Sequence, residues 1–246
     1  NEVKEGIAVN LNVSPVLVKV GSATELGFFV NTKPGNLSFY DLEFDRERLM
    51  HVIGVRDDMN EFFHIHPQRS EKPEIFTINH IFTKPGKYKI WSEIKKDGLN
   101  HIFGHPEITV SGEGAVAEKK VAFGRNAIVG SYQVQFDVPE TVVKGKVTQL
   151  SFDVHTLTGS EVEVENYLGV PMHLTVISDD WKQFIHTHPA GHDGRRDDQA
   201  PPVPVVLSRV RAPGPDRHPP GIRGFPPPVR SRCRDLPFGD PGAESL

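Results

Sequence analysis

Six histidines of this chain fall into two sets of three with the same spacing. The first set lies in MHVIGVRDDMNEFFHIHP, from Met50 to Pro67, and the second in MHLTVISDDWKQFIHTHP, from Met172 to Pro189. Both stretches carry an opening Met-His, an Asp-Asp pair and a closing His-x-His-Pro, so the shared pattern is M-H-x(12)-H-x-H-P. Imidazole nitrogens are common ligands of zinc and copper. Three of them in one place would therefore suit such an ion.

The spacing within the first stretch predicts that its histidines meet on one face of a β-hairpin. His64 and His66 point the same way on a strand, because side chains alternate between faces. Residues 57–60 are the natural turn, and centring it on Asp58-Met59 pairs positions whose numbers sum to 117. This register sets His51 opposite His66, with Cβ atoms about 4.5–5.5 Å apart, and leaves His64 on the diagonal at about 7–8 Å. A slip of one residue would turn His51 to the other face.

The second stretch gives the same arrangement with a pairing sum of 361. Three imidazoles with metal–nitrogen bonds of about 2.0–2.1 Å can hold an ion and leave one coordination position open. We therefore predict one copper or zinc ion in each copy, bound by His51, His64 and His66 in the first and by His173, His186 and His188 in the second. Because ligation needs neutral imidazoles, the affinity is expected to fall below about pH 6.5.

Three other residues are candidates for additional ligands. Met50 and Met172 each offer a thioether, but strand alternation turns each away from the neighbouring histidine, so the preferred interpretation is that both lie in the core. His192 follows His188 by four residues and would add a ligand to the second site.

Two other interpretations of the histidines stay open. In a structural interpretation, the imidazoles hydrogen-bond to carbonyls at strand ends and serve hairpin packing in a structural or adhesion protein. In an enzymatic interpretation, an open metal position would support hydrolysis or redox chemistry, which requires a general base. Spacing places no carboxylate near the histidines, so the enzymatic interpretation ranks last and we expect a protein without catalytic activity.

The elements that carry these motifs are predicted to be β-strands. Short runs rich in Val, Ile, Phe and Thr are separated by turn signals such as KVG, TKPG and KKDG, and no segment shows a helical apolar period. A second alignment, of residues 13–30 with residues 137–154, extends the internal repeat beyond the histidines. Copies of about 100 residues with strands of this kind are typical of immunoglobulin-like β-sandwiches.

We therefore predict an all-β protein made of two tandem immunoglobulin-like β-sandwich modules. Residues 1–110 would form the first module, 111–126 a linker and 127–192 an incomplete second module. The second copy is truncated, because nothing after His188 matches the strands that follow HIHP in the first copy. It should expose a strand edge and apolar surface, which a dimer through this module would cover.

The remaining residues, 193–246, are predicted to form a disordered tail. From Gln199 onward there are twelve prolines and seven arginines but no lysine. Each proline removes a donor from a β-ladder, and a segment of this composition cannot bury a core. Two explanations for the abrupt change are open: an out-of-frame read of a GC-rich gene, or a genuine Pro/Arg-rich tail.

The overall composition narrows the partners. The 246 residues carry a formal net charge of −4, which provides no basic field for nucleic acid. No apolar run approaches the roughly 18–20 residues of a membrane span. The single cysteine, Cys233, excludes an internal disulfide framework and a multi-thiolate zinc site. The chain begins at Asn1 without a signal peptide, as a mature exported protein or a trimmed chain would.

The histidine motif, with Met50, His51, His64, His66 and Pro67 in its first copy, resembles a family of bacterial exported proteins built from tandem immunoglobulin-like modules. More distantly it resembles the copper-associated periplasmic modules of the CopC and YtkA-like kind. The resemblance covers about residues 8–192. It implies a periplasmic or extracellular location after removal of a signal peptide, a link to heavy metals and no known catalytic activity. Another envelope protein is a candidate partner beside the metal ion. An H-x-H on a sandwich strand is also similar to copper–zinc superoxide dismutase, but the other ligands and the disulfide of that enzyme are absent.

Overall fold

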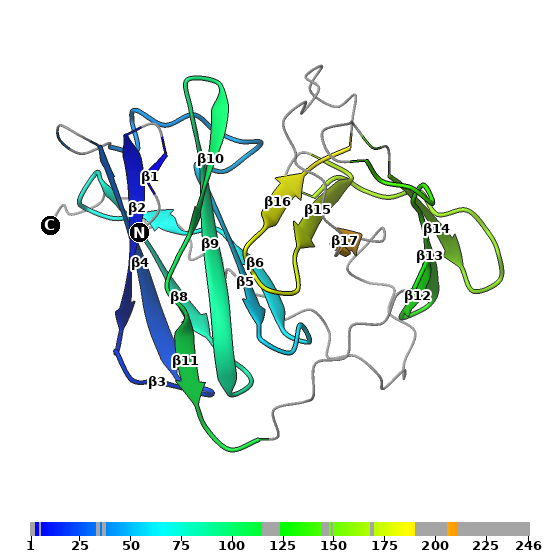
Figure 1. Cartoon of the computed structure of the whole chain (residues 1–246), viewed down its shortest axis with the longest axis horizontal. Coiled ribbons are helices and arrows are strands. Elements are labelled where there is room, and N and C mark those ends of the chain that lie inside the picture. Colours follow the sequence, from blue (N-terminus) through cyan, green and yellow to red (C-terminus); the bar gives the residue numbers. More distant parts are fainter. Residues whose placement is uncertain are drawn as a thin grey trace, which may run out of the picture.

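The computed structural model describes residues 3, 4, 6–32, 35, 38–114, 124–143, 148, 150–167 and 170–189, together with the strand 206–210. Every described element is a β-strand, which confirms the all-β prediction (Figure 1). The strands are β1 (Val3–Lys4), β2 (Ile7–Ser14), β3 (Val18–Lys19), β4 (Ala23–Thr32), β5 (Met50–Arg56), β6 (Phe62–Ile65), β7 (Gln68–Arg69), β8 (Ile75–Ile81), β9 (Gly86–Lys96), β10 (Leu99–Gly104), β11 (Ile108–Ser111), β12 (Asn126–Val129), β13 (Tyr132–Asp137), β14 (Ser151–Thr156), β15 (Met172–Ile177), β16 (Phe184–Thr187) and β17 (Val206–Val210).

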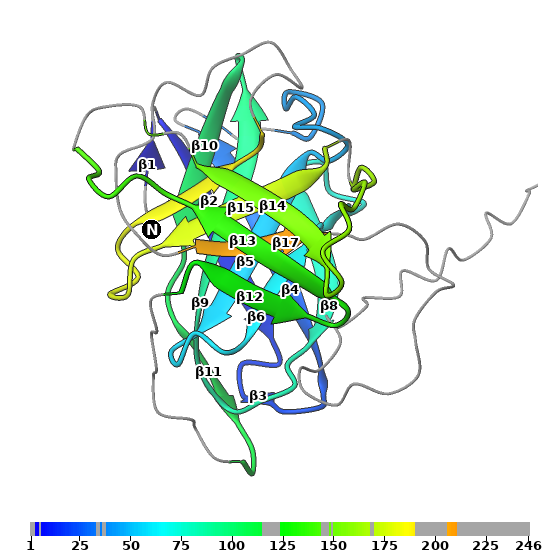
Figure 2. The ribbon, with the colours of Figure 1, turned by 90° about the vertical axis from the view of Figure 1, so that its right-hand side faces the viewer.

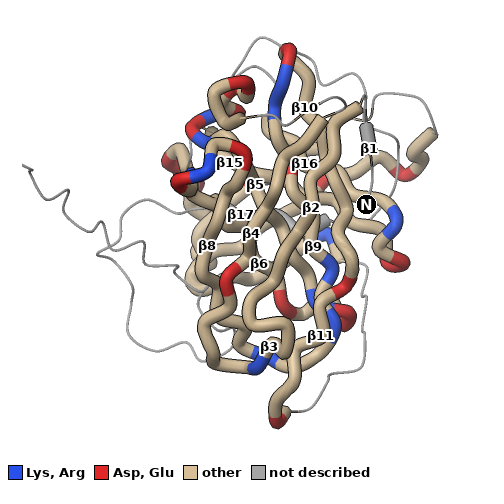
Figure 3. The backbone as a smooth tube through the Cα atoms, turned by 90° about the vertical axis from the view of Figure 1, so that its left-hand side faces the viewer, with Lys and Arg blue, Asp and Glu red and all other residues tan. Residues whose placement is uncertain are grey.

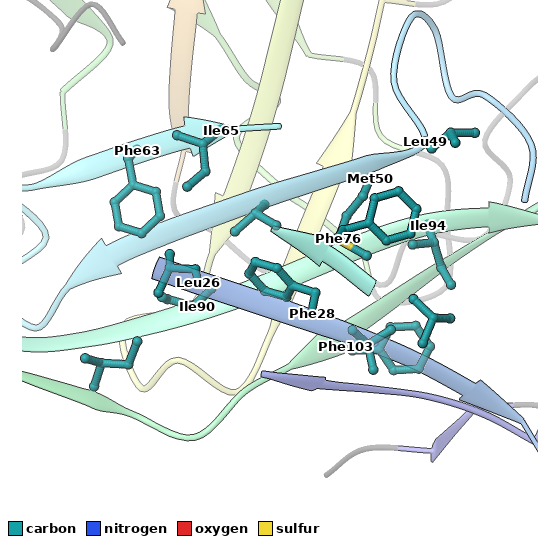
Figure 4. Packing of buried hydrophobic residues seen from close by; sticks show 14 of the residues in the cluster. Leu26, Phe28, Leu49, Met50, Phe63, Ile65, Phe76, Ile90, Ile94 and Phe103 are labelled. Carbon is teal, nitrogen blue, oxygen red and sulfur yellow. The ribbon is translucent and has the colours of Figure 1, made fainter. Parts of the chain in front are cut away.

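The first module consists of two sheets that enclose one apolar core. One sheet has the strand order β1-β2-β4-β8-β7, and the other has the order β3-β11-β9-β5-β6 with β10 paired to β9. Neighbouring strands are antiparallel apart from β3 and β11, which are parallel. Side chains from both sheets meet between them, as Figure 4 shows for Leu26 and Phe28 of β4 against Met50 of β5 and Ile94 of β9.

Alternation along the strands decides which side chains enter this core. In β4, Leu26, Phe28 and Val30 are fully buried, whereas their neighbours along the strand are more exposed. Strand β5 differs, because all seven of its residues are buried. One of its faces packs into the core of the first module, and its other face is covered by the second module.

The second module contains two smaller sheets, β12-β13-β14 and β16-β15-β17. Its described part buries few large apolar side chains, of which Leu174 and Ile177 belong to β15. By contrast Ile128 is 62% exposed and Val129 56% exposed. Exposed apolar side chains also occur in the first module, where Val16 is 87% exposed.

The two modules meet through the histidine-bearing hairpins. Figures 1 and 2 show β15 and β16 lying alongside β5, β6 and β9 of the first module. Trp91 of β9 stacks on Phe184 of β16 with ring centroids 4.8 Å apart, and Val55 and Ile177 are buried in the same small apolar cluster. The outer face of β5 is therefore an interface between modules.

The tail differs from its prediction in one place. Strand β17 pairs antiparallel with β15, from Met172 opposite Val210 to Val176 opposite Val206. The sequence between Pro204 and Pro213 contains no proline and two valines followed by a leucine, so these few residues can extend a sheet although the tail as a whole is rich in proline. The rest of the tail, and residues 115–123 of the predicted linker, lie outside the described residues.

Two surface features complete the fold. Figure 3 shows residues of both charge signs interspersed over one face, mostly at turns, with few charges along β2, β4 and β8. Among the described residues, no helix is long and apolar enough to cross a membrane.

Candidate metal centre

The first histidine hairpin has the register that its spacing predicts. Strands β5 and β6 pair Val52 with Ile65 and Ile53 with His64, both of which sum to 117. The turn is closed by a hydrogen bond of 2.9 Å from the Met59 amide to the Arg56 carbonyl, and Met59 adopts a positive φ of 63°. The four-residue loop and this tight turn together fix the register of the two strands, so the histidines share one face of the hairpin.

The second hairpin repeats this geometry down to its turn. Strands β15 and β16 pair Thr175 with His186, which sums to the predicted 361. Trp181 has a positive φ of 61°, and its amide donates to the Ser178 carbonyl at 3.0 Å. In both turns an Asp accepts a hydrogen bond of 3.0 Å from the amide two residues on, with Asp58 and Asp180 in equivalent positions.

Within the first hairpin the three histidines converge on one nitrogen. His51 Nδ1 lies 3.1 Å from His64 Nε2 and 3.2 Å from His66 Nε2. His51 Nε2 lies 3.1 Å from the carbonyl oxygen of Asp45, to which it donates. Because that nitrogen carries the ring proton, Nδ1 of neutral His51 presents a lone pair to its neighbours.

The second hairpin has the same contacts. His173 Nδ1 lies 3.4 Å from His186 Nε2 and 3.1 Å from His188 Nε2. His173 Nε2 donates to the carbonyl oxygen of Tyr167 at 2.8 Å. The rings of each predicted set are therefore in contact with one another, although among the described residues His66 does not belong to a group of three histidines whose ligating atoms all lie within 4.8 Å of one another.

The structure also brings the two sets into contact, which the sequence did not predict. The ring centroid of His186 lies 5.3 Å from that of His51 and 5.2 Å from that of His64. His173 lies 5.5 Å from His64. Instead of one separate site per module there is a single cluster at the interface, which we call the six-histidine cluster: His51, His64, His66, His173, His186 and His188.

Two groups within this cluster have ligating atoms that all lie within 4.8 Å of one another. One group is His51, His64 and His186, which takes ligands from both modules, and the other is His173, His186 and His188. A tetrahedral ion with metal–nitrogen bonds of about 2.0–2.1 Å separates its ligand nitrogens by about 3.3–3.4 Å. The nitrogen separations of 3.1–3.4 Å around His51 and His173 are close to this value.

Burial keeps most of the cluster imidazoles neutral. Burial and then the neighbouring histidines lower the pKa of His66 and of His188 to about 2 and hold that of His64 well below its usual value. The pKa of His173 is lowered to about 4, again mainly by burial. These rings therefore stay neutral well below pH 6.5, where an exposed histidine is about half protonated.

A family model described as a domain of unknown function (DUF8832) matches residues 1–112 and 127–215. The chain belongs to this family. Each matched DUF8832 segment contains one histidine hairpin, and the second segment extends past β17. No curated protein matches the chain.

A carboxylate of the first DUF8832 segment reaches a histidine of the second. Glu93 Oε2 accepts a hydrogen bond of 2.5 Å from His186 Nδ1, and both side chains are almost completely buried. Asn100 donates to the other oxygen of Glu93 at 3.0 Å. Burial alone would raise the pKa of Glu93, but the electrostatic attraction and hydrogen bond of His186 outweigh it, so the pKa of Glu93 is lowered and its carboxyl group is ionised at neutral pH.

The expectation that no carboxylate lies near the histidines is thus wrong. Glu93 stands directly opposite His51 in the pairing of β5 with β9, a contact between strands about forty residues apart in the chain. The sequence did contain a signal for this carboxylate. Glu93 lies within the largely apolar run IWSEI, and a charged side chain is rarely buried in a core without a partner.

The additional ligand candidates have different outcomes. Met50 is 1% exposed and belongs to the apolar core of the first module, so it faces away from the cluster, as the preferred interpretation held. Met172, at the equivalent position on β15, is half-buried and has Val210 as its strand partner. His192 lies outside the described residues.

Proposed function

We propose that this chain is a non-catalytic protein of the bacterial envelope that binds a zinc or copper ion through the six-histidine cluster, in order to buffer the metal or pass it on. The observation that carries the proposal is that two groups of three histidines have ligating atoms within 4.8 Å of one another. Repetition of the hairpin alone would not carry it, since duplication copies structural motifs as well as functional ones.

The donor set favours zinc or copper over hard cations. All six donors are imidazole nitrogens, which suit zinc and copper, whereas magnesium and calcium prefer oxygen ligands. His51 and His173 each have one nitrogen hydrogen-bonded to a backbone carbonyl, and this type of second interaction orients a metal-ligating histidine. The lowered pKa values mean that few protons must be displaced at neutral pH.

The surroundings of the cluster support binding rather than catalysis. His51 is 1% exposed and His64 is 8% exposed, so a substrate would have little access to an ion between them. Glu93, the carboxylate hydrogen-bonded to the cluster, is already engaged by His186 and Asn100 and is poorly placed to act as a general base.

The location and fold type belong to this proposal as well. The motif's resemblance to exported proteins favours the periplasm or the extracellular space, with another envelope protein as the partner that delivers or accepts metal. The two sheets around one core in the first module favour an immunoglobulin-like sandwich.

Metal titration of the full chain tests the proposal. Calorimetric titration with Zn²⁺ or Cu²⁺ should show tight binding to the unmodified chain and a loss of affinity of at least about 100-fold in His64→Ala/His66→Ala, because His64 is a ligand of the group that spans both modules and His66 contacts His51 of the same group. The matched control is His80→Ala/His155→Ala, which removes two imidazoles outside the cluster and should bind like the unmodified chain. Equally weak binding by all three chains would contradict a metal function.

A structural role for the histidines is the second candidate, and specific contacts favour it. His51 and His173 hydrogen-bond to backbone carbonyls, and the rings of the two modules pack against each other beside Trp91 and Phe184. In this case the His64→Ala/His66→Ala chain would melt at a lower temperature, and neither it nor the unmodified chain would respond to metal.

A further inference from the structure

We infer that the two modules share a single metal ion, with His186 as the common ligand and Glu93 as the residue that positions it. This inference rests on the proposed function and deepens it, because it replaces one ion per module by one ion per chain. It also makes the second module part of the site that the first module's hairpin begins.

The two ligand groups cannot both be filled, because they have His186 in common. One group combines His186 with His51 and His64, and the other combines it with His173 and His188. His186 Nδ1 donates to Glu93 Oε2, so the ring binds an ion in its neutral form and through Nε2. A nitrogen lone pair binds one ion, so an ion in either group takes the ligand that the other group needs.

The charges around the cluster also favour one ion. Among the described residues, Glu93 is the carboxylate hydrogen-bonded to a cluster histidine, and it would offset half the charge of a dication. The positive charges of Arg46 and Arg48 lie near the outer histidines, His188 and His66 respectively. A second buried dication would therefore meet the repulsion of the first ion and of these two arginines.

Glu93 is a positioning residue that works across the module boundary. It belongs to β9 of the first module, whereas His186 belongs to β16 of the second. Its hydrogen bond holds the proton on Nδ1 and turns Nε2 toward His51, His64 and His173, while Asn100 fixes the second carboxylate oxygen. Carboxylate partners of this kind set the tautomer and raise the basicity of metal-ligating histidines.

Native mass spectrometry with Zn²⁺ alone gives the ion count that tests the inference. The unmodified chain should retain one tightly bound ion, and His186→Ala should retain none, because both groups lose a ligand. Two independent sites would give two ions on the unmodified chain and one on His186→Ala. The His80→Ala chain serves as the control for loss of a partly buried histidine outside the cluster and should keep one ion.

The outcomes separate this inference from the proposed function. Two ions on the unmodified chain would overturn sharing while metal binding stands, whereas no ion on the unmodified chain would overturn both. If His186→Ala fails to fold, as shown by its circular dichroism, Glu93→Gln supplies the test, since glutamine keeps the size of the side chain and one acceptor oxygen but removes the charge. Glu93→Gln should weaken Zn²⁺ binding about 10–100-fold. Unchanged Zn²⁺ affinity in Glu93→Gln would overturn the positioning role.

Discussion

The two nitrogens of His51 have different partners, and this difference decides what the ring can do. Nε2 donates to the carbonyl of Asp45, so Nδ1 is the acceptor that faces His64 and His66. His173 repeats the arrangement with the carbonyl of Tyr167. The sequence could place these rings on one face, but it could not assign their tautomers, because the carbonyls come from loops whose path the strand pattern does not specify.

A buried histidine outside the cluster gives a prediction about acid stability. His105 is 1% exposed, with Nε2 2.8 Å from Ser92 Oγ, and burial lowers its pKa to about 3. Its pKa in the unfolded chain is about 6.5. The unfolded state therefore binds the proton first as the pH falls, and stability is lost progressively from about pH 6.5 down to about pH 3. Between pH 7 and pH 5 this residue should remove about 2 kcal/mol of unfolding free energy.

Urea unfolding at pH 7 and pH 5 checks this value. His105→Gln keeps a hydrogen-bonding group near Ser92 but does not titrate, so the pH-dependent loss should be about 2 kcal/mol smaller in the variant than in the unmodified chain. The comparison is between pH values within each chain, so a general cost of the substitution does not enter. Equal losses in both chains would show that His105 does not contribute to the acid response.

At the scale of elements, the hairpins follow from local rules. The turn residues, the alternation of faces and the pairing sums of 117 and 361 are all encoded within eighteen residues, and the structure has the predicted register in both copies. The pairing of β5 with β9 is not local, and it is this pairing that sets Glu93 opposite His51. The docking of one hairpin on the other is also non-local. For this reason the sequence predicted the two sets of histidines, but it did not predict that the sets form one cluster or that Glu93 is bonded to it.

The close contact between β5 and β6 gives a prediction at this scale. Gly54 lies directly opposite Phe63, and a Cβ at Gly54 would overlap the Phe63 ring. That ring is confined by Phe82 and Tyr88 in the core, so it has little room to move. Gly54→Ala should therefore lower the free energy of unfolding by about 1–3 kcal/mol, as overpacked cores do.

Gly27 of β4 provides the matched control for this substitution. A Cβ at Gly27 would meet its nearest heavy atom, the Asn12 carbonyl oxygen, at 3.9 Å, which is an ordinary contact. Gly27→Ala should leave stability unchanged or raise it by up to about 1 kcal/mol through the lower entropy of the unfolded chain. Urea midpoints of the two variants compare the effects, and a Gly54→Ala chain as stable as Gly27→Ala would contradict the packing argument.

At the scale of the whole molecule, strand β17 takes the place in the second module that β9 has in the first. Met50 pairs with Ile94 and His51 with Glu93, and in the same order Met172 pairs with Val210 and His173 with Arg209. The residue at the position of Glu93 is therefore an arginine in the second copy. The two hairpins are near copies of each other, but their neighbouring strands are not, and the carboxylate support of the cluster is one-sided.

The contact between the modules gives the last prediction. Trp91 of the first module and Phe184 of the second are stacked with an interplanar angle of 20°, next to buried Val55 and Ile177. If the modules are docked through this contact, the two rings must stabilise each other, and Trp91→Ala and Phe184→Ala should be non-additive by about 0.5–1.5 kcal/mol in a double-mutant cycle. Phe152→Ala is the control partner, because its ring stacks on Phe136 within the second module. Trp91→Ala and Phe152→Ala should add within about 0.5 kcal/mol. Both cycles are measured from urea unfolding. If both pairs of substitutions are additive, the modules are not held together at this contact. A metal ion shared across the boundary would then have to hold the modules together without help from the Trp91–Phe184 stack.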